Sequence, residues 1–231
     1  MSGAGTQGPR LIRADLHNHT HFSPDSILSP QRFVERARSR GIDCIAVTDH
    51  DTLRGAAAVR EAAVAAGLRV IVGEEIRTAE GEVLGLFLSE EVPRGLSPEE
   101  TIERVKAQGG LAGVPHPYDH LRSALNPGAL ARVVDRLDFI EALNARMVFA
   151  SNNVEARDYA LKHSLPMSAG SDAHAPLEVG RAYVEMPDFN DPRSFLDSLR
   201  AGRLVGRLSS PLVHLISRYA VLRRLLGWRP A

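Results

Sequence analysis

The sequence contains very little cysteine, and its single thiol excludes two classes of structure. Cys44 cannot form an intrachain disulfide, and a zinc site built from several thiolates is excluded as well. The thiol lies in an apolar run over residues 42–47, so we expect it to be buried in a strand. Long hydrophobic segments are also missing, because no run of about 18 apolar residues occurs and residues 1–10 carry no signal-peptide core. These absences predict a soluble, cytoplasmic protein that does not associate with membranes.

The chain also lacks an excess of either charge. Its 28 Lys and Arg side chains balance 28 Asp and Glu side chains, so no overall field attracts nucleic acid or an anionic membrane. We therefore expect no long nucleic acid as a partner. Lysine itself is scarce, because Lys106 and Lys162 are the only two. The arginine-rich composition either serves bidentate binding of anions or reflects genomic base composition.

The overall composition is typical of one folded domain. The chain has 231 residues, of which 44% are hydrophobic and 24% charged. Residues 1–9 are small and polar, and they predict a flexible tail. We expect residues 10–231 to form a single domain that includes a C-terminal covering helix. This helix is amphipathic and carries arginines, so we expect it to pack on the domain or on a second subunit of a homo-oligomer; binding to an anionic membrane is the alternative.

Short apolar runs alternate with helical patterns along the chain. Helices are expected at residues 30–40, 52–66, 98–108, 127–136, 152–163, 192–201 and 211–226. About seven alternations predict parallel strands with helical crossovers, and the lack of a Gly-rich loop after the first strand favours a closed barrel over an open sheet. The expected strands are residues 11–16, 44–48, 69–72, 110–114, 139–143 and 166–169, with weaker candidates at 83–88 and 182–186.

Histidine and acidic residues gather where these strands end. His17 and His19 are two residues apart, so both rings point to one side of an extended backbone. Similar clusters occupy residues 48–51, 73–76, 115–117 and 170–174, and Glu141 lies in the strand at 139–143. Any one histidine could be a packed residue, but barrel closure would bring the clusters together at the face that carries active sites. Imidazole and carboxylate donors predict a metal site for Zn, Mn, Fe or Mg.

Five motifs, in this order, resemble the PHP (polymerase and histidinol phosphatase) superfamily of metal-dependent phosphoesterases. They are Asp-Leu-His-x-His-Thr, Thr-Asp-His-Asp, Gly-Glu-Glu-Ile, Pro-His-Pro and Ser-Asp-Ala-His, and the match spans residues 13–183. The resemblance implies an α/β fold, namely a distorted seven-stranded (β/α) barrel of the TIM type. It also implies two or three divalent ions, which we expect to be Mn, Zn, Fe or Mg, at the C-terminal face.

The resemblance further implies which residues bind these ions. Asp25 stands where many relatives have a histidine, and the nearby His21 is the competing candidate. The implied ligands are His17, His19, Glu75 and Asp172 for the first metal, Asp25, His50 and His174 for the second, and Glu75 with His116 for the third.

Glu82 departs from the family pattern. The stretch Glu-Val-Leu-Gly aligns with a family stretch reading His-Ile-Leu-Gly, so Glu82 falls where relatives place a histidine that binds the third metal. A carboxylate can replace imidazole and would favour a harder ion such as Mn or Mg. The alternative is a solvent-exposed glutamate and a site with two metals.

Other polar residues near the strand ends have candidate roles around the metals. Arg122 and Arg146 could bind a phosphate in a bidentate manner, although both could be surface residues. His120 is a candidate proton donor to a leaving oxygen. Asp15 and Asp49 could each orient a ligating imidazole, or they could cap loops. His163 and His214 lie on expected helices, and we interpret them as structural.

These observations favour a phosphatase that hydrolyses a small phosphomonoester with a hydroxide activated by the metals. A nuclease or nucleotide phosphodiesterase is the first alternative, but relatives of that kind carry an inserted domain, for which the interval between Glu82 and His116 is too short. A metal-stabilised accessory module without turnover is the second alternative. The intact ligand positions argue against it.

Overall fold

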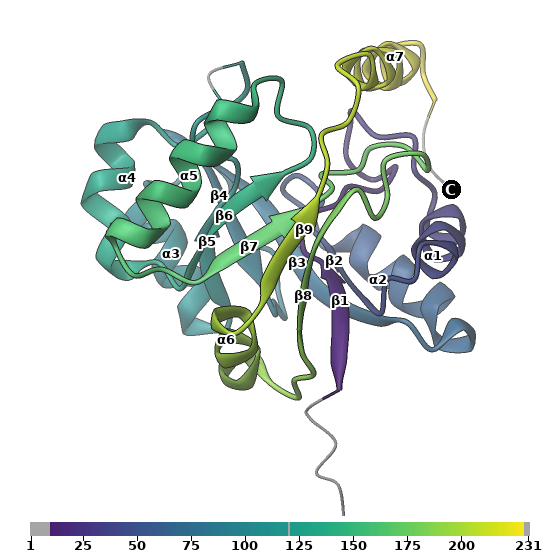
Figure 1. Ribbon diagram of the computed structural model, residues 1–231. Coiled ribbons are helices and arrows are strands. Elements are labelled where there is room, and N and C mark those ends of the chain that lie inside the picture. Colours follow the sequence, from purple (N-terminus) through teal and green to yellow (C-terminus); the bar gives the residue numbers. More distant parts are fainter. Residues whose placement is uncertain (1–9, 120, 229–231) are drawn as a thin grey trace, which may run out of the picture.

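The computed structural model describes residues 10–119 and 121–228. The flexible tail expected at residues 1–9 and the candidate proton donor His120 lie outside the described residues. Within them, the chain forms an α/β structure whose sheet curls into a nearly closed barrel (Figure 1). The strands are β1 (Leu11–Asp15), β2 (Cys44–Val47), β3 (Arg69–Thr78), β4 (Gly81–Leu86), β5 (Leu111–Val114), β6 (Phe139–Asn144), β7 (Met167–Gly170), β8 (Ala182–Pro187) and β9 (Arg203–Gly206).

The helices lie around this sheet. Figure 1 shows α1 and α2 on one side of the barrel and α3, α4 and α5 on the other. Each of α1, α3 and α6 begins with a polar N-cap side chain followed by proline, as the sequence predicts. The helices are α1 (Pro30–Ser39), α2 (Arg54–Ala63), α3 (Pro98–Ala107), α4 (Pro127–Val133), α5 (Ala150–Lys162), α6 (Pro192–Arg200) and α7 (Val213–Leu225).

The order of the strands in the sheet is β7-β6-β5-β4-β3-β2-β1-β8-β9. Backbone hydrogen bonds join its β7 and β1 regions, because Leu16 N donates to Ala169 O at 3.1 Å and Asp172 N donates to His17 O at 2.7 Å. These bonds nearly close a ring of seven strands, β1 to β7. The expected seven-stranded barrel is therefore confirmed.

The expectation of parallel strands is wrong for two of the expected strands, those at residues 83–88 and 182–186. β4 pairs antiparallel with both β3 and β5, and β8 is antiparallel to β1. Only Ala79 and Glu80 separate β3 from β4, and a connection this short can join antiparallel strands but not parallel ones. Gly81 completes this turn with a φ of 125°, which side-chain-bearing residues rarely adopt. β9 was not expected, and it pairs antiparallel with β8.

Three apolar clusters hold the helices and the sheet together. Phe139, Leu84 and Phe195 belong to a cluster inside the barrel, and Cys44 is buried there in β2, as expected. Two further clusters lie under α1 and α2 and under α3 and α4. In the described part of the chain, no helix has both the length and the apolar character needed to cross a membrane.

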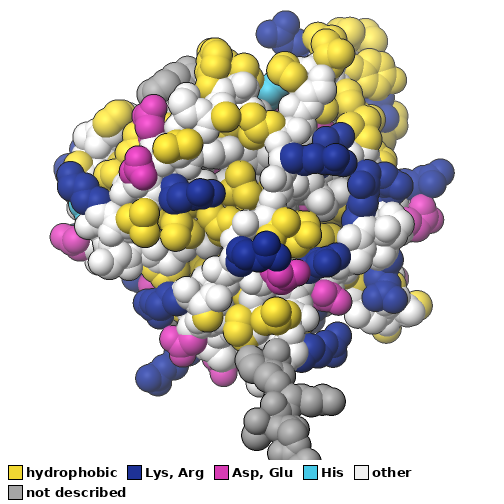
Figure 2. All heavy atoms as spheres, in the orientation of Figure 1, with side chains coloured by type: hydrophobic (Ala, Val, Ile, Leu, Met, Phe, Trp, Pro, Cys, Tyr) yellow, Lys and Arg dark blue, Asp and Glu magenta, His cyan; other side chains and the backbone are white. Residues whose placement is uncertain are grey.

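α7 lies over the C-terminal ends of the strands, apart from the other helices (Figure 1). At its start, Arg146 Nη2 donates to Val213 O at 3.3 Å and to Ser217 Oγ at 3.0 Å. Near its end, Arg224 Nη2 donates to Ser23 O at 3.0 Å. The helix is thus bonded at both ends to loops that follow β6 and β1. Figure 2 shows apolar side chains and arginines gathered on the outer surface of this region.

Candidate metal centre

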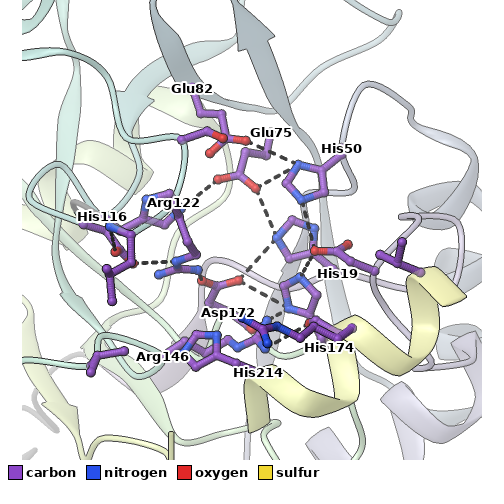
Figure 3. Close-up of a pocket in the computed structure, with 18 residues that line it drawn as sticks. His19, His50, Glu75, Glu82, His116, Arg122, Arg146, Asp172, His174 and His214 are labelled. Atoms are coloured by element: carbon purple, nitrogen blue, oxygen red, sulfur yellow. Dashed lines mark hydrogen bonds and ion pairs between the residues drawn. The ribbon is translucent and has the colours of Figure 1, made fainter.

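The nine residues implied as metal ligands converge at the C-terminal ends of the strands. His17 and His19 follow β1, Asp25 lies in the loop after them, and His50 follows β2. The other five come from β3, β4 and the segments after β5 and β7. They are Glu75, Glu82, His116, Asp172 and His174. Of the nine residues, all except His17 line one cavity of about 730 Å³ (Figure 3).

Glu75 lies at the centre of the cluster. Its Oε1 is 3.0 Å from His116 Nε2 and 3.5 Å from His17 Nε2. Its Oε2 is 3.2 Å from both His19 Nε2 and His50 Nδ1. The side chain is almost fully buried, so one carboxylate contacts four imidazoles away from bulk water.

Two aspartates hold the other side of the cluster. Asp172 Oδ1 lies 3.4 Å from His19 Nε2 and 3.5 Å from His174 Nδ1. Asp25 Oδ2 lies 3.0 Å from His174 Nε2 and 3.7 Å from His50 Nε2. The competing candidate His21 packs instead against Phe22 and Trp228. The geometry therefore favours Asp25 over His21 as a member of the cluster.

The donor set fits divalent cations. Four groups of three residues place one ligand atom each within 4.8 Å of one another. Asp25 Oδ1 is buried and has no hydrogen-bond partner among the described residues, as expected of an oxygen directed at a cation. The four groups are His17, His19 and Glu75; His50, Glu75 and Glu82; His19, His50 and His174; and His17, His116 and Asp172.

Glu82 is not the solvent-exposed side chain of the alternative interpretation. It is 4% exposed, and its Oε1 lies 3.8 Å from His50 Nδ1. Burial and the neighbouring Glu75 raise the pKa of its carboxyl to about 8. Glu82 thus groups with His50 and Glu75, whereas His116 contacts Glu75 from the other side.

Strong electrostatic coupling links the imidazoles and carboxylates. Burial disfavours the charged ring of His50, but Glu75 and Asp25 raise its pKa to about 10. The same holds for His17: burial lowers its pKa, but Glu141 and Glu75 raise this pKa well above the usual range. Burial opposes ionisation of Glu75, but His17 and His50 hold its pKa well below the usual range. Imidazolium–carboxylate pairs would therefore balance the charge of the cluster without a cation, and a metal ion must displace their protons.

A carboxylate that was not among the two candidates, Asp15 and Asp49, contacts a ligating imidazole. Glu141 has that position, because its Oε1 lies 3.1 Å from His17 Nδ1 and its Oε2 accepts from the backbone N–H of His116 at 2.8 Å. Gly170 leaves room for this contact, since a Cβ there would lie 2.3 Å from His17 Cβ. The only sequence signal was the position of Glu141 in the strand at 139–143.

Neither expected aspartate contacts an imidazole directly. Asp15 accepts from Ser171 N at 2.8 Å and from Gly180 N at 3.0 Å, so its alternative role as a loop cap is correct. Asp49 accepts from Ser23 Oγ at 2.7 Å, and this hydroxyl lies 3.1 Å from His19 Nδ1. Ser23, which the sequence analysis missed, therefore connects Asp49 to the cluster.

The two candidate arginines have different surroundings. Arg122 lines the cavity and pairs with Asp119 and Asp172. Arg146 is 3% exposed, so it is not a surface residue, and its Nε lies 3.1 Å from Glu178 Oε2. Arg146 also lines the cavity, but its guanidinium binds Glu178 and α7, whereas the guanidinium of Arg122 lies along the cavity wall and pairs with Asp172 of the cluster (Figure 3).

The two histidines interpreted as structural, His163 and His214, differ in whether they line the cavity. His163 stacks on Tyr159 with ring centroids 4.3 Å apart and does not line the cavity, in keeping with a structural role. His214 does line the cavity, a position that its interpretation as a structural residue did not anticipate. The sequence pattern gave no signal for this position, because it depends on how α7 crosses the barrel.

Chelation should destabilise the protein, and more so at alkaline pH. Purified protein from a metal-supplemented culture is expected to carry two or three ions per chain, and EDTA should lower its Tm. Because the folded pKa of His50 is raised to about 10, the stabilising imidazolium pairs are present below pH 6.5 and are lost as the pH rises toward 10. Calorimetry with and without EDTA should therefore show a larger loss of Tm at pH 9.5 than at pH 6.5. Less than half an ion per chain, or an equal loss at both pH values, would contradict this expectation.

The sequence matches the models of a known protein family. The sequence model of the PHP domain matches residues 15–161, and a second model, described as PHP-associated, matches residues 150–204. A relative from Methanocaldococcus jannaschii, an uncharacterised protein, is 44% identical over 145 residues, which are 58% of this chain and 82% of the relative. A 5'-3' exoribonuclease of Haemophilus influenzae is 32% identical over 130 residues, 51% of this chain and 47% of that protein.

A solved structure shares the fold. The crystal structure of a Bifidobacterium adolescentis protein assigned as a metal-dependent phosphoesterase superimposes with a TM-score of 0.63 and 20% identity, covering 85% of this chain and 98% of that one. At this level of identity the likeness concerns the architecture of the barrel.

Proposed function

The chain belongs to the PHP domain family of metal-dependent hydrolases, and from this premise we propose that it is a phosphatase acting on small phosphomonoesters. The observation that carries the proposal is the cavity of about 730 Å³ in which the imidazole–carboxylate cluster and Arg122 face one another. This volume is within the range of small-molecule sites. A phosphoryl group held there would contact the cluster on one side and a guanidinium on the other.

The nine clustered side chains would hold the metals. Glu75 is the shared ligand in this proposal, with His17, His19 and Asp172 around one ion and Asp25, His50 and His174 around a second. Glu82 and His116 would complete a third. When bound, such ions lower the pKa of a water molecule and neutralise charge on phosphoryl oxygens. Zn, Mn or Fe suits this mixture of imidazole and carboxylate, and a harder ion such as Mg suits the position beside Glu82.

The residues of the chain itself would bind and orient the substrate. Asp119 holds the Arg122 guanidinium at the cavity wall. A planar guanidinium can donate two parallel hydrogen bonds to a phosphoryl group, which favours the dianionic end of a monoester. Glu141 and Ser23 keep the rings of His17 and His19 in fixed orientations.

The placement of α7 supports a small substrate over a long polynucleotide. His214, Ser217 and Arg218 of this helix line the cavity, so α7 forms one of its walls. The chain also has no net positive charge with which to bind a long polyanion. The similarity to an exoribonuclease supports the alternative, a nuclease that processes short oligonucleotides.

A panel of substrates distinguishes these functions. Metal-loaded protein would be assayed with p-nitrophenyl phosphate, bis-p-nitrophenyl phosphate, a set of phosphorylated metabolites and short RNA with a 5'-phosphate. We expect monoesters to have the highest kcat/KM. Faster release of mononucleotides from RNA would establish the nuclease alternative, and no turnover of any ester by protein with its full metal content would leave a non-catalytic module.

Arg122→Lys should lower kcat/KM for phosphomonoesters by about ten- to one-hundredfold, because a lysine keeps the charge but loses the paired hydrogen bonds. Metal content, measured by elemental analysis, should stay unchanged. Arg136→Lys is a matched control, since Arg136 pairs with Glu103 on the exposed surface. Equal kinetics for Arg122→Lys and the control would show that Arg122 does not contact substrate.

A further inference from the structure

The first two turns of α7 bring a histidine into the cavity. His214, Ser217 and Arg218 line it together with the cluster residues (Figure 3). The position of these turns is well defined, because Val213 is buried and Arg146 binds both its carbonyl oxygen and the Ser217 hydroxyl. His214 is therefore held at the cavity by the same arginine that anchors the helix.

One nitrogen of the His214 ring has no partner. His214 Nε2 is buried and has no hydrogen-bond partner among the described residues. A buried polar atom without a partner is uncommon, and a bound ligand is one way to satisfy it. Figure 3 shows the ring beside Arg146, on the α7 side of the cavity.

The charged groups around His214 are mainly arginines, which would attract an anion. Burial, Arg146 and Arg122 lower its pKa, and Asp172 raises it by a smaller amount. Arg218, from the same helix, also lines the cavity. In the free protein the neutral ring is therefore favoured near pH 7. A dianionic phosphoryl group in the cavity would offset the guanidinium charges and favour the protonated ring.

His214 differs from the other titratable groups of the cavity wall. The remaining histidines that line the described cavity, His19, His50, His116 and His174, all belong to the metal cluster. Asp119 is held ionised by Arg122, which lowers its pKa despite partial burial. Among the described residues that line the cavity, His214 is thus the histidine that lies outside the metal cluster, and its ring has a nitrogen without a partner.

We propose that His214 donates a proton from Nε2 to the leaving oxygen of the substrate, which makes it a catalytic residue. This inference rests on the proposed phosphatase function. In the step, the oxygen of water bonds to phosphorus, keeps one proton and releases the other to solvent, the bond from phosphorus to the ester oxygen breaks, and its electron pair goes to the ester oxygen. The proton of His214 Nε2 moves to the same oxygen, so the alcohol leaves neutral, and the ring recovers its proton from solvent.

The dependence on the leaving group tests this role. An alkyl alcohol needs a proton to leave, whereas p-nitrophenolate leaves readily without one. We expect His214→Gln to lower kcat for glycerol phosphate by about a hundredfold and kcat for p-nitrophenyl phosphate by less than threefold. Leu215→Ala is the matched control, because this neighbour on α7 is 57% exposed and does not line the cavity.

Proton uptake provides a readout that needs no turnover. Sulfate, a dianion that does not itself titrate near neutral pH, would be bound to the metal-loaded protein at pH 7.5 in Pipes and in Tris. A difference in binding enthalpy between the two buffers reports protons taken up. We expect uptake in the native protein and in Leu215→Ala, and its loss in His214→Gln.

The outcomes separate this inference from the function on which it rests. No hydrolysis of any monoester by the native protein would overturn the phosphatase and the acid role together. An active native protein whose His214→Gln variant loses both esters equally, or loses neither, would overturn the acid role alone. Unchanged proton uptake in His214→Gln would do the same.

Discussion

Glu75→Gln is expected to lower kcat by at least about a thousandfold and to release at least one metal ion per chain. The carboxylate lies within 3.5 Å of the nitrogens of four imidazoles and carries the negative charge around which the cluster is built. Glutamine has nearly the same shape but no charge, and its amide nitrogen would point a donor at the ligands. Elemental analysis and steady-state kinetics on the same preparation measure both effects.

The preceding residue provides the control for this variant. Glu74 is also fully buried in β3, but it accepts from the Val92 backbone N–H and lies outside the cluster. Burial raises the pKa of its carboxyl to about 8, so the neutral form prevails at pH 7 and Glu74→Gln changes the charge little. Full metal content and turnover in Glu75→Gln would show that Glu75 is not a metal ligand.

The sequence predicted the location of the site well because each motif is local. His17 and His19 lie on the same side of an extended segment whatever the rest of the chain does. The motifs at His50, His116 and Asp172 follow apolar runs short enough to be strands, and a barrel brings all strand ends to one face. The convergence of the clusters therefore depended only on closure of the sheet.

Contacts between distant segments could not be predicted in the same way. The direction of β4 depends on the two-residue turn before it, although its apolar run was visible. Glu141 reaches His17 only because β6 and β1 both lie beside β7 in the curled sheet. His214 reaches the cavity because Arg146 fixes the start of α7. None of these pairings leaves a periodic signal in the sequence.

The burial of Glu82 decides between the two interpretations that its departure from the family pattern left open. The sequence left two interpretations of this residue, a metal ligand or an exposed side chain. The structure excludes exposure and places its carboxyl beside His50 and Glu75. Without a cation, an ionised carboxylate buried this close to Glu75 is unfavourable, and the pKa of Glu82 is accordingly raised to about 8. A metal ion between Glu75 and Glu82 would remove this cost.

Glu82→Ala should therefore lose one metal ion per chain and most of the turnover. The raised pKa adds a pH signature: below pH 8 the ion must displace a proton from Glu82, so its affinity should rise up to about pH 8 and then level off. Glu82→His should restore the ion and shift the preference from Mn or Mg toward Zn, because imidazole is the softer ligand. Metal titrations followed by elemental analysis measure each of these changes.

Glu80→Ala is the control, because Glu80 lies on the same β-hairpin but pairs with Arg132 at the surface. This variant should keep its metals and its turnover, although it loses an exposed ion pair. If Glu82→Ala retains the full metal content and full turnover as well, then the carboxylate of Glu82 is not a ligand. In that case Glu82 would be buried beside Glu75 in its protonated, neutral form, which its raised pKa favours at pH 7. The site would then bind two metals rather than three.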